Sequence, residues 1–450
     1  MTGSSTGFPS SLAARLRSQH WNMELWQSVA RDALPHFPEL ALTATQIQRV
    51  LASVQGKAAS FPDDFLGRCL LPDAWAAEPP NAIVSQRRFP RPPEPTRFEG
   101  QPRQMRWLTD YAFKQYDVAS SVVESPGARV GCFKWLYPDG RSDEWALAFT
   151  RENATFFADM TYVPYCDYIQ AFEPVSGNAI FSFGGSSVVE VSGSGRFFFI
   201  GGRENYLHWL ADHLALALFD ECQDVVKNAT LVCNDVTEWQ QRVLAFFGLN
   251  NPILRLQAPL PKPVFYRFPS LTVPTGFPVP ERFAALRRRF AQIHGEPEAH
   301  GGRIYLSRAK LRPRHRVANE EEVAALFERR GFRVLYPETM PLAVVARLCA
   351  NASIVANAPG SSHGNFFVFS PPNAVLISLT SGLFLGDVDY VQAAAGAVLL
   401  VPFLDRIVSV YGAPAGLPNP TGLPLDMAEN FDLGELDRAV DEAEALQARL

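Results

Sequence analysis

Three polar side chains at the start of one apolar stretch have the types and spacing for acid–base chemistry. Asn205, His208 and Asp212 supply an amide, an imidazole and a carboxylate. At 100° per residue of an α-helix they fall within an arc of about 60°, and leucines and alanines fill the opposite side. Buried polar groups are costly unless they are paired or used. The pattern predicts that this end of a buried helix opens onto a cavity.

Two residues of this cluster are candidates for a general base. Asp212 can accept a proton itself, or it can orient His208 by a hydrogen bond and leave the imidazole as the base. Both residues can also be structural, or only bind substrate. We favour Asp212, with His208 as its rival, and we expect Asn205 to bind substrate.

A basic segment supplies a second set of candidates. Residues 301–318 hold six Lys or Arg side chains, one His and no acid. Arg308 follows a predicted strand, where a guanidinium can make paired bonds to phosphate oxygens. We expect Arg308, with Arg303 and Ser307, to bind phosphate. We do not expect nucleic acid as a partner, because no aromatic side chains interleave with the basic ones after Arg308 and the net charge is −5.

The third set lies in the loop 358–365, with the sequence Ala-Pro-Gly-Ser-Ser-His-Gly-Asn. Small residues with accessible backbone amides suit a loop that holds a phosphate or a nucleoside. The loop follows a predicted strand of the same α/β half as Arg308, so both loops can contribute to one site. Its candidate residues are Gly360, Ser361, Ser362, His363 and Asn365.

The elements that must position these groups form two α/β series. Strands are predicted at 130–136, 145–149, 179–183 and 188–191, and Gly201-Gly202 then allows a sharp turn. The first series continues with helix 205–220, strand 230–233, helix 237–247 and strand 253–256. A basic helix over 281–294 precedes the second series, which has strands at 303–307, 332–335, 353–356 and 375–379. This series has two predicted helices. The first begins after Asn319, which forms a capping box with Glu322, and it ends at Gly331; the second covers residues 342–349.

The remaining segments complete the predicted domain organisation. Residues 11–57 are typical of two helices, residues 72–102 of an extended Pro-rich linker, and residues 433–450 of an acidic amphipathic helix that packs back on the first half. We therefore expect an α/β protein with a helical N-terminal extension and linker (1–115), an N-terminal acceptor domain (116–275), a C-terminal donor domain (276–425) and the returning helix (426–450).

Composition fits a globular, cytoplasmic protein. The 450 residues are 47% hydrophobic, enough for two or three cores. Six dispersed cysteines without a C-x-x-C motif suit reduced thiols. The sequence shows neither a signal peptide nor an apolar run of about 20 residues, the length of a membrane-spanning helix. The Asp387-Val-Asp389 triplet follows the second α/β series, so we do not expect it to hold a metal.

The three sets occur in an order that resembles glycosyltransferase family 61. Asn205-Tyr-Leu-His208-Trp-Leu-Ala-Asp212 is similar to that family's Asn-Tyr-x-His-Trp-x-x-Asp segment. The runs that follow are Arg303-Ile-Tyr-Leu-Ser-Arg308, Asn319-Glu-Glu-Glu-Val, Arg330-Gly-Phe-Arg-Val, Ala352-Ser-Ile-Val, Gly360-Ser-Ser and Asn365-Phe-Phe. The resemblance covers roughly residues 195–380. Where the family often has His-Gly-Ala-Gly-Leu, this chain has Pro359-Gly-Ser-Ser-His363.

The resemblance implies a GT-B fold, in which two Rossmann-like domains face a cleft, and an inverting, metal-independent transfer. The donor would be a nucleotide sugar, first of all a UDP-sugar, and no other cofactor is implied. The acceptor would be a glycan or glycolipid of a bacterial surface polysaccharide such as capsule or lipopolysaccharide, which leaves peripheral membrane association and the oligomeric state open. A nucleotide-sugar epimerase and a catalytically silent glycan-binding or scaffold protein are the alternatives.

Overall fold

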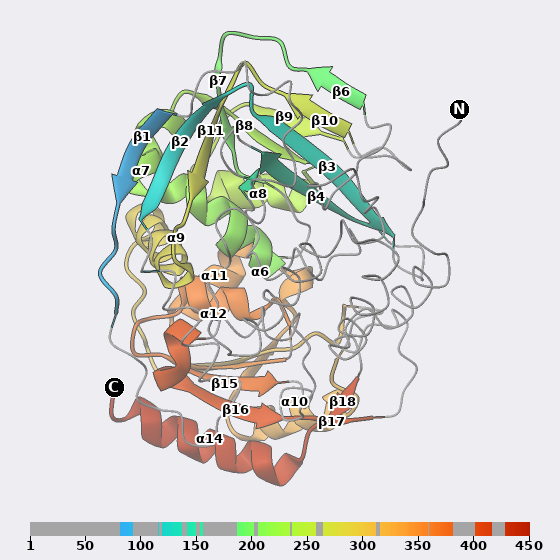
Figure 1. Cartoon of the computed structure of the whole chain (residues 1–450). Coiled ribbons are helices and arrows are strands. Elements are labelled where there is room, and N and C mark those ends of the chain that lie inside the picture. The colour runs from blue at the N-terminus through green and yellow to red at the C-terminus, as the bar shows by residue number, and fades with distance from the viewer. Residues whose placement is uncertain are drawn as a thin grey trace, which may run out of the picture.

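The computed structural model describes residues 82–92, 116, 119–136, 142–149, 154–155, 187–201, 206–234, 236–257, 264–311, 316–358, 360–380, 401–415 and 428–450. Asn205, Asp387, Asp389, the predicted helices of 11–57 and the predicted strand 179–183 lie outside these ranges. In Figure 1 two sheets form the upper part of the molecule and a third sheet the lower part, with helices between them. The chain is therefore a mixed α/β structure.

The first sheet carries the parallel strands of the predicted first α/β series. Its six strands have the order β1-β2-β11-β7-β8-β9, with bounds Ala82–Arg87 (β1), Ser120–Pro126 (β2), Ser270–Thr275 (β11), Arg196–Phe199 (β7), Ala229–Asn234 (β8) and Ile253–Leu256 (β9). Strands β11, β7, β8 and β9 are parallel to one another, while β2 pairs antiparallel with both β1 and β11. The sheet is thus mixed, and β1 shows that part of the predicted linker is an edge strand.

The second sheet is built mainly from the predicted strands between residues 128 and 200. Its order is β5-β4-β3-β10-β6, with bounds Ala154–Thr155 (β5), Ser142–Phe149 (β4), Arg129–Leu136 (β3), Val264–Arg267 (β10) and Ser187–Glu190 (β6). Strands β3 and β4 form an antiparallel pair in which Leu136 faces Ser142. This pairing confirms the predicted strands 130–136 and 145–149 and makes them neighbours in one sheet.

The third sheet is parallel throughout and contains the strands of the second α/β series. Its order is β13-β12-β14-β15-β16, with bounds Arg333–Leu335 (β13), Gly302–Leu306 (β12), Ala352–Asn357 (β14), Val375–Thr380 (β15) and Ile407–Tyr411 (β16). In chain order this is the second, first, third, fourth and fifth strand. Strand order therefore reverses between β12 and β14, and such a switch point is where doubly wound sheets bind ligands, at the carboxyl ends of the strands.

Helices cover both faces of this sheet. Helix α10 (Glu320–Arg329) and helix α14 (Leu433–Gln447) pack on one face, and α11 (Leu342–Ala350) and α12 (His363–Phe369) pack on the other. Helix α9 (Val279–His294) lies between α12 and the first sheet (Figure 1). Helices α7 (Asp220–Val226) and α8 (Glu238–Phe246) belong to the first sheet, and a two-stranded sheet joins β17 (Ala413–Pro414) to β18 (Glu429–Asn430). Short 3₁₀ turns span Pro337–Thr339 and Val401–Arg406.

Two expectations for the second series need correction. Asn319 does not cap α10: its side chain instead donates to the carbonyl of Phe431 at 2.9 Å and accepts from the Phe431 amide at 3.0 Å. Helix α14 does not pack on the first half, because its apolar side joins the core between the third sheet and α10. The stop at Gly331 is confirmed, with a φ of 80°.

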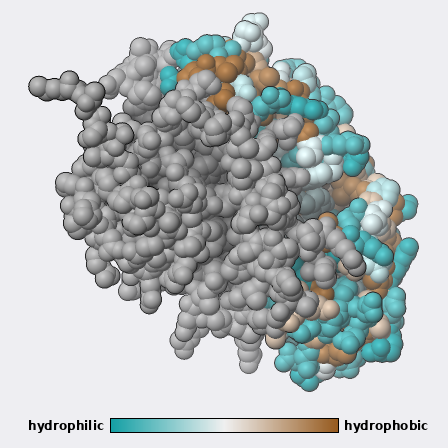
Figure 2. Space-filling model, turned by 90° about the vertical axis from the view of Figure 1, so that its right-hand side faces the viewer, coloured by the Kyte–Doolittle hydropathy of each residue, from teal (hydrophilic) through white to brown (hydrophobic). Residues whose placement is uncertain are grey.

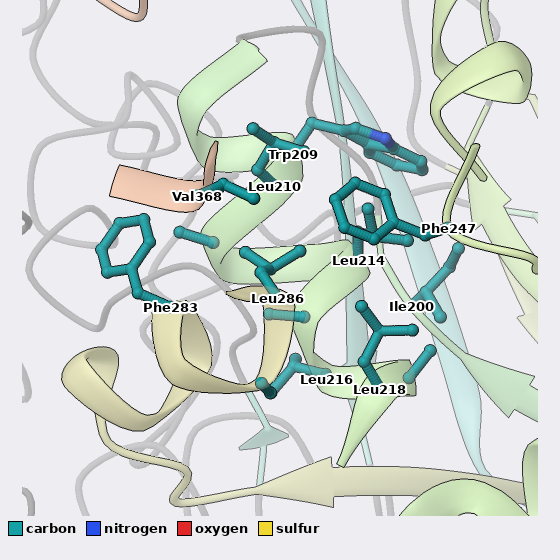
Figure 3. Packing of buried hydrophobic residues seen from close by; sticks show 14 of the residues in the cluster. Ile200, Trp209, Leu210, Leu214, Leu216, Leu218, Phe247, Phe283, Leu286 and Val368 are labelled. Carbon is teal, nitrogen blue, oxygen red and sulfur yellow. The ribbon is translucent and has the colours of Figure 1, made fainter. Parts of the chain in front are cut away.

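The predicted helix 205–220 is helical but irregular. It consists of α6 (Tyr206–His208), a π-helical turn (Trp209–His213) and a 3₁₀ turn (Leu214–Leu218). Its apolar side chains share a core with β7, α8, α9 and α12, and in Figure 3 Leu210 and Leu214 lie beside Leu286 of α9. A π-turn inserts one extra residue into a helix and is frequent at functional sites. The prediction that this helix is buried is confirmed.

On the face in Figure 2, polar residues cover much of the described area and hydrophobic residues form patches between them. Within the described ranges, no helix combines the length and apolar character needed to cross a bilayer.

Candidate active site

His208 and Asp212 form a buried pair. His208 Nδ1 lies 2.7 Å from Asp212 Oδ2, and the two residues are 7% and 1% exposed. The bond directs the imidazole so that Nε2 is on the ring edge away from the carboxylate. This is the arrangement in which a carboxylate sets the orientation of a histidine base.

Asp212 is held in its charged form by its neighbours. Burial alone would raise the pKa of Asp212, but the hydrogen bond and charge of His208, together with Arg282 and His213, outweigh it and lower the pKa below 3.8. An aspartate with a low pKa and with both carboxylate oxygens bonded is a weak proton acceptor. The geometry therefore favours His208 over Asp212 as the group that takes a proton.

Arg282 is a site residue that sequence reasoning missed. It lies on α9 and donates from Nη1 to Asp212 Oδ1 at 2.9 Å, while its Nε donates to the carbonyl of Phe277 at 2.8 Å. Its signal in the sequence was weak, because α9 carries several arginines and Asp212 is 70 residues away. Arg282 compensates the buried carboxylate and fixes its rotamer.

His213 is a structural neighbour of the pair. Its side chain is buried and its Nδ1 lies 3.0 Å from the carbonyl oxygen of Ile200, to which it donates. The bond ties the π-turn to the end of β7, just before Gly201, whose φ of 71° makes the predicted sharp turn.

Arg308 and Gly360 meet at the switch point of the third sheet. Arg308 follows β12 and is 6% exposed, and Gly360 lies in the turn after β14. A Cβ built on Gly360 would lie 1.7 Å from Nη1 and 2.8 Å from Cζ of Arg308. The guanidinium therefore rests directly on the glycine backbone, and the loop 358–365 lies beside Arg308.

His363 fixes this turn. Its Nδ1 lies 2.7 Å from the carbonyl oxygen of Gly360 and its Nε2 lies 2.8 Å from Ser378 Oγ. The pKa of His363 is lowered to about 4, mainly by burial. The hydrogen bond to the Gly360 carbonyl raises this pKa, whereas the charges of Arg308 and Arg316 lower it further. Since a carbonyl only accepts, the neutral ring donates from Nδ1 and accepts the Ser378 hydroxyl at Nε2. His363 thus holds Gly360 in place and is not a base.

The other predicted donor residues divide into two groups. Asn365 accepts a hydrogen bond from the Tyr206 hydroxyl at 2.9 Å, and Ser361 and Ser362 lie in the turn between Gly360 and α12. Ser307 is next to Arg308, but its hydroxyl donates to Glu320, a partly buried carboxyl that also accepts from Tyr305. Burial raises the pKa of Glu320. The hydrogen bonds from Ser307 and Tyr305 lower this pKa but do not outweigh the effect of burial.

Arg303 is not brought to the site. It lies near the start of β12, whereas Arg308 follows its end, and five residues of extended strand span roughly 16 Å. Its guanidinium pairs with Glu444 of α14 and donates to the carbonyl of Arg330. The structure thus gives Arg303 a role in anchoring α14.

Helices α6 and α12 connect His208 with the switch-point loop. The Tyr206–Asn365 bond joins them, and a Cβ on Gly364 would lie 3.2 Å from the terminal carbons of both Leu207 and Leu210. His208 on α6 and the turn 360–363 before α12 are therefore adjacent parts of one region. It combines an acid–base pair with a buried, phosphate-competent arginine.

These features can be compared with known protein families. Residues 206–377 match the family model Glycosyltransferase 61. The match begins at the first residue of α6 and ends in β15, so it covers the His208–Asp212 pair, Arg282, Arg308 and the switch-point loop. A comparison with curated proteins finds no significant match.

The chain therefore contains a glycosyltransferase 61 domain, as its motifs predicted, and the protein is a glycosyltransferase. Its reaction takes a sugar donor and an acceptor.

Proposed function

We propose that the protein transfers a sugar from a nucleotide-sugar donor, first of all a UDP-sugar, to a glycan or glycolipid acceptor, with inversion and without a metal. The observation that carries the proposal is the contact of Arg308 with Gly360 at the switch point of a parallel sheet. A buried guanidinium at that edge is suited to the two phosphates of such a donor. The proposal extends to a GT-B arrangement, with acceptor domain 116–275, donor domain 276–425 and flanking segments 1–115 and 426–450.

The reaction follows from the positions of the charged groups. His208 Nε2 takes the proton of an acceptor hydroxyl, and the charge of Asp212 stabilises the imidazolium that forms. The acceptor oxygen then bonds to the anomeric carbon from the face opposite the diphosphate. The carbon–oxygen bond to the diphosphate breaks, its electron pair leaves with the phosphate oxygen, and Arg308 offsets the resulting charge.

The biological setting is part of the same proposal. We place the enzyme in the cytoplasm of a bacterium, where nucleotide sugars serve the synthesis of capsule or lipopolysaccharide, with peripheral contact to a membrane where the acceptor is a glycolipid. The dispersed cysteines support the cytoplasmic setting. Loss of surface polysaccharide on deletion of the gene is the expected phenotype.

The test is incubation of the protein with UDP-, GDP- and CMP-sugars, with binding and sugar release followed in parallel. One donor class should stabilise the wild type and be slowly hydrolysed. Asp212→Asn should keep binding but lose hydrolysis, and Arg308→Ala should lose binding. If no nucleotide sugar binds, the result favours the alternative of a catalytically silent glycan-binding protein. If the product is a sugar epimer that is still attached to its nucleotide, the result indicates an epimerase.

A further inference from the structure

Asn357 carries a buried side-chain amide at the carboxyl end of β14. Its residue is 0% exposed, and neither Oδ1 nor Nδ2 makes a hydrogen bond in the described part of the chain. An amide that is buried with both polar atoms unpaired is expensive and rare in native proteins. The position therefore calls for a group that supplies both a donor and an acceptor.

The strand register shows which way this amide faces. Asn357 is opposite Leu306 of β12 and Ser378 of β15. Val355, two residues earlier, belongs to the core on the α11 and α12 side, and Ala356 to the core on the α10 and α14 side. Because side chains alternate along a strand, Asn357 faces α12. Ser378 shares this face and bonds to His363, so the amide lies beneath the turn that carries Gly360.

The same turn holds a second buried polar group, the Ser362 hydroxyl. Within the described ranges the Ser362 hydroxyl is buried and makes no hydrogen bond. The turn's backbone is already used, since the amides of His363, Gly364 and Asn365 bond to the carbonyls of Gly360, Ser361 and Ser362. The amide of Asn357 and the hydroxyl of Ser362 are thus side-chain groups left over at the switch point.

The chemistry of these groups selects the kind of ligand. Phosphate oxygens accept hydrogen bonds, so they can satisfy Asn357 Nδ2 but not Oδ1. A sugar hydroxyl both donates and accepts, and two neighbouring hydroxyls match the two ends of a side-chain amide. The face that carries Asn357 is the α12 face, and α12 contacts α6, the helix of His208. This favours the transferred sugar over the ribose, because the reacting carbon must lie near the base.

We propose that Asn357 and Ser362 bind hydroxyls of the transferred sugar and so determine which donor sugar the enzyme accepts. The proposal rests on the proposed function, since it assigns the sugar end of the same nucleotide-sugar site. The two sets of residues then bind different parts of the donor. Arg308 binds the diphosphate, and Asn357 and Ser362 bind the sugar ring that is transferred from it.

The test is a comparison of dissociation constants for UDP and for UDP-glucose, UDP-galactose, UDP-N-acetylglucosamine and UDP-xylose, by calorimetry. Asn357→Leu removes both polar atoms at similar volume, and Ser362→Ala removes the hydroxyl. Each variant should bind UDP within about twofold of wild type and bind the preferred UDP-sugar about tenfold more weakly, or more in the double variant. The melting temperature of unliganded Asn357→Leu should equal or exceed that of wild type, which shows that the variant folds.

Other outcomes separate the possible failures. If both variants bind the UDP-sugars as wild type does, the orphan groups are structural and the inference is wrong, although the proposed function stands. If the variants lose UDP and UDP-sugar affinity equally, the groups contact the nucleotide and the inference is also wrong. If wild type binds neither UDP nor any of the sugars, and GDP and CMP equivalents also fail, the proposed function itself is overturned.

Discussion

Arg282 Nη1 lies 2.9 Å from Asp212 Oδ1, and the two side chains are only 11% and 2% exposed. The pair joins α9 to the π-turn that follows His208, so one arginine on a neighbouring helix neutralises the carboxylate of the acid–base pair. Removing one partner of a buried pair leaves the other charge uncompensated, which is strongly destabilising.

Arg282→Met should therefore lower the free energy of unfolding by roughly 3 kcal/mol. It should also raise the pKa of Asp212, because a nearby positive charge is lost. Arg289→Met is the matched control on the same helix: Arg289 also donates from Nε to a phenylalanine carbonyl, that of Phe247 at 2.9 Å. The free energy of unfolding of both variants can be measured by urea denaturation. An equal loss of stability in the two variants would contradict a special role for the Arg282–Asp212 pair.

Asp212→Asn should reduce kcat by about 10²- to 10⁴-fold with little change in donor affinity. The asparagine keeps the shape but no longer stabilises the imidazolium of His208, whose Nδ1 it faces. His213→Asn serves as the control, because His213 is buried in the same turn but donates to the Ile200 carbonyl. Transfer assays at saturating donor should show that His213→Asn keeps most of the activity; an equally active Asp212→Asn would remove the pair from the mechanism.

Gly360→Ala should weaken donor binding by at least about tenfold. The new methyl group would lie 1.7 Å from Nη1 of Arg308 and must displace the guanidinium. Gly360 has a φ of 129°, so part of any effect is backbone strain. Gly295→Ala controls for strain, since Gly295 has a φ of 89° and a Cβ there meets nothing within 4 Å. Equal donor affinity in the two variants would show that Arg308 is not displaced from a binding position.

Much of this framework could be predicted from sequence. Hydrophobic period and glycine stops placed β9 at residues 253–256, as observed, and placed β12 and β14 within one or two residues. The Arg308 and Gly360 loops were assigned to one site because both follow strands of the same half. These are local signals, written in neighbouring residues.

The missed features depend on distant parts of the chain. Asn319 was expected to cap α10, but the backbone of Phe431 offers it two hydrogen bonds from 112 residues away. Arg282 could not be told from the other arginines of α9 without knowing which one faces Asp212. In the sequence Asn357 has no feature that distinguishes it from other residues at the end of a strand. Its importance follows from its burial and from its position opposite Leu306 in the sheet.

Acid should destabilise the protein through His363. The folded pKa is about 4 and the ordinary value is 6.5, so between these pH values the unfolded chain binds a proton that the folded chain does not. The contribution of His363 to the free energy of unfolding is therefore greatest above pH 6.5. It falls by roughly 1.4 kcal/mol per pH unit as the pH is lowered toward 4. His363→Gln should lose less stability than wild type between pH 7 and pH 5 in urea titrations. Parallel losses in the two proteins would mean that His363 is protonated in the fold.

The central claim is that Arg308 at the switch point holds the diphosphate of the donor. The most direct measurement is the dissociation constant of the nucleoside diphosphate that wild type binds best, taken for Arg308→Ala and Arg303→Ala side by side. Arg303 lies within β12 and pairs with Glu444 near the start of the strand, whereas Arg308 follows the end of the strand. We predict a loss of at least about tenfold for Arg308→Ala and no loss for Arg303→Ala. Binding by Arg308→Ala as tight as wild type would contradict the account.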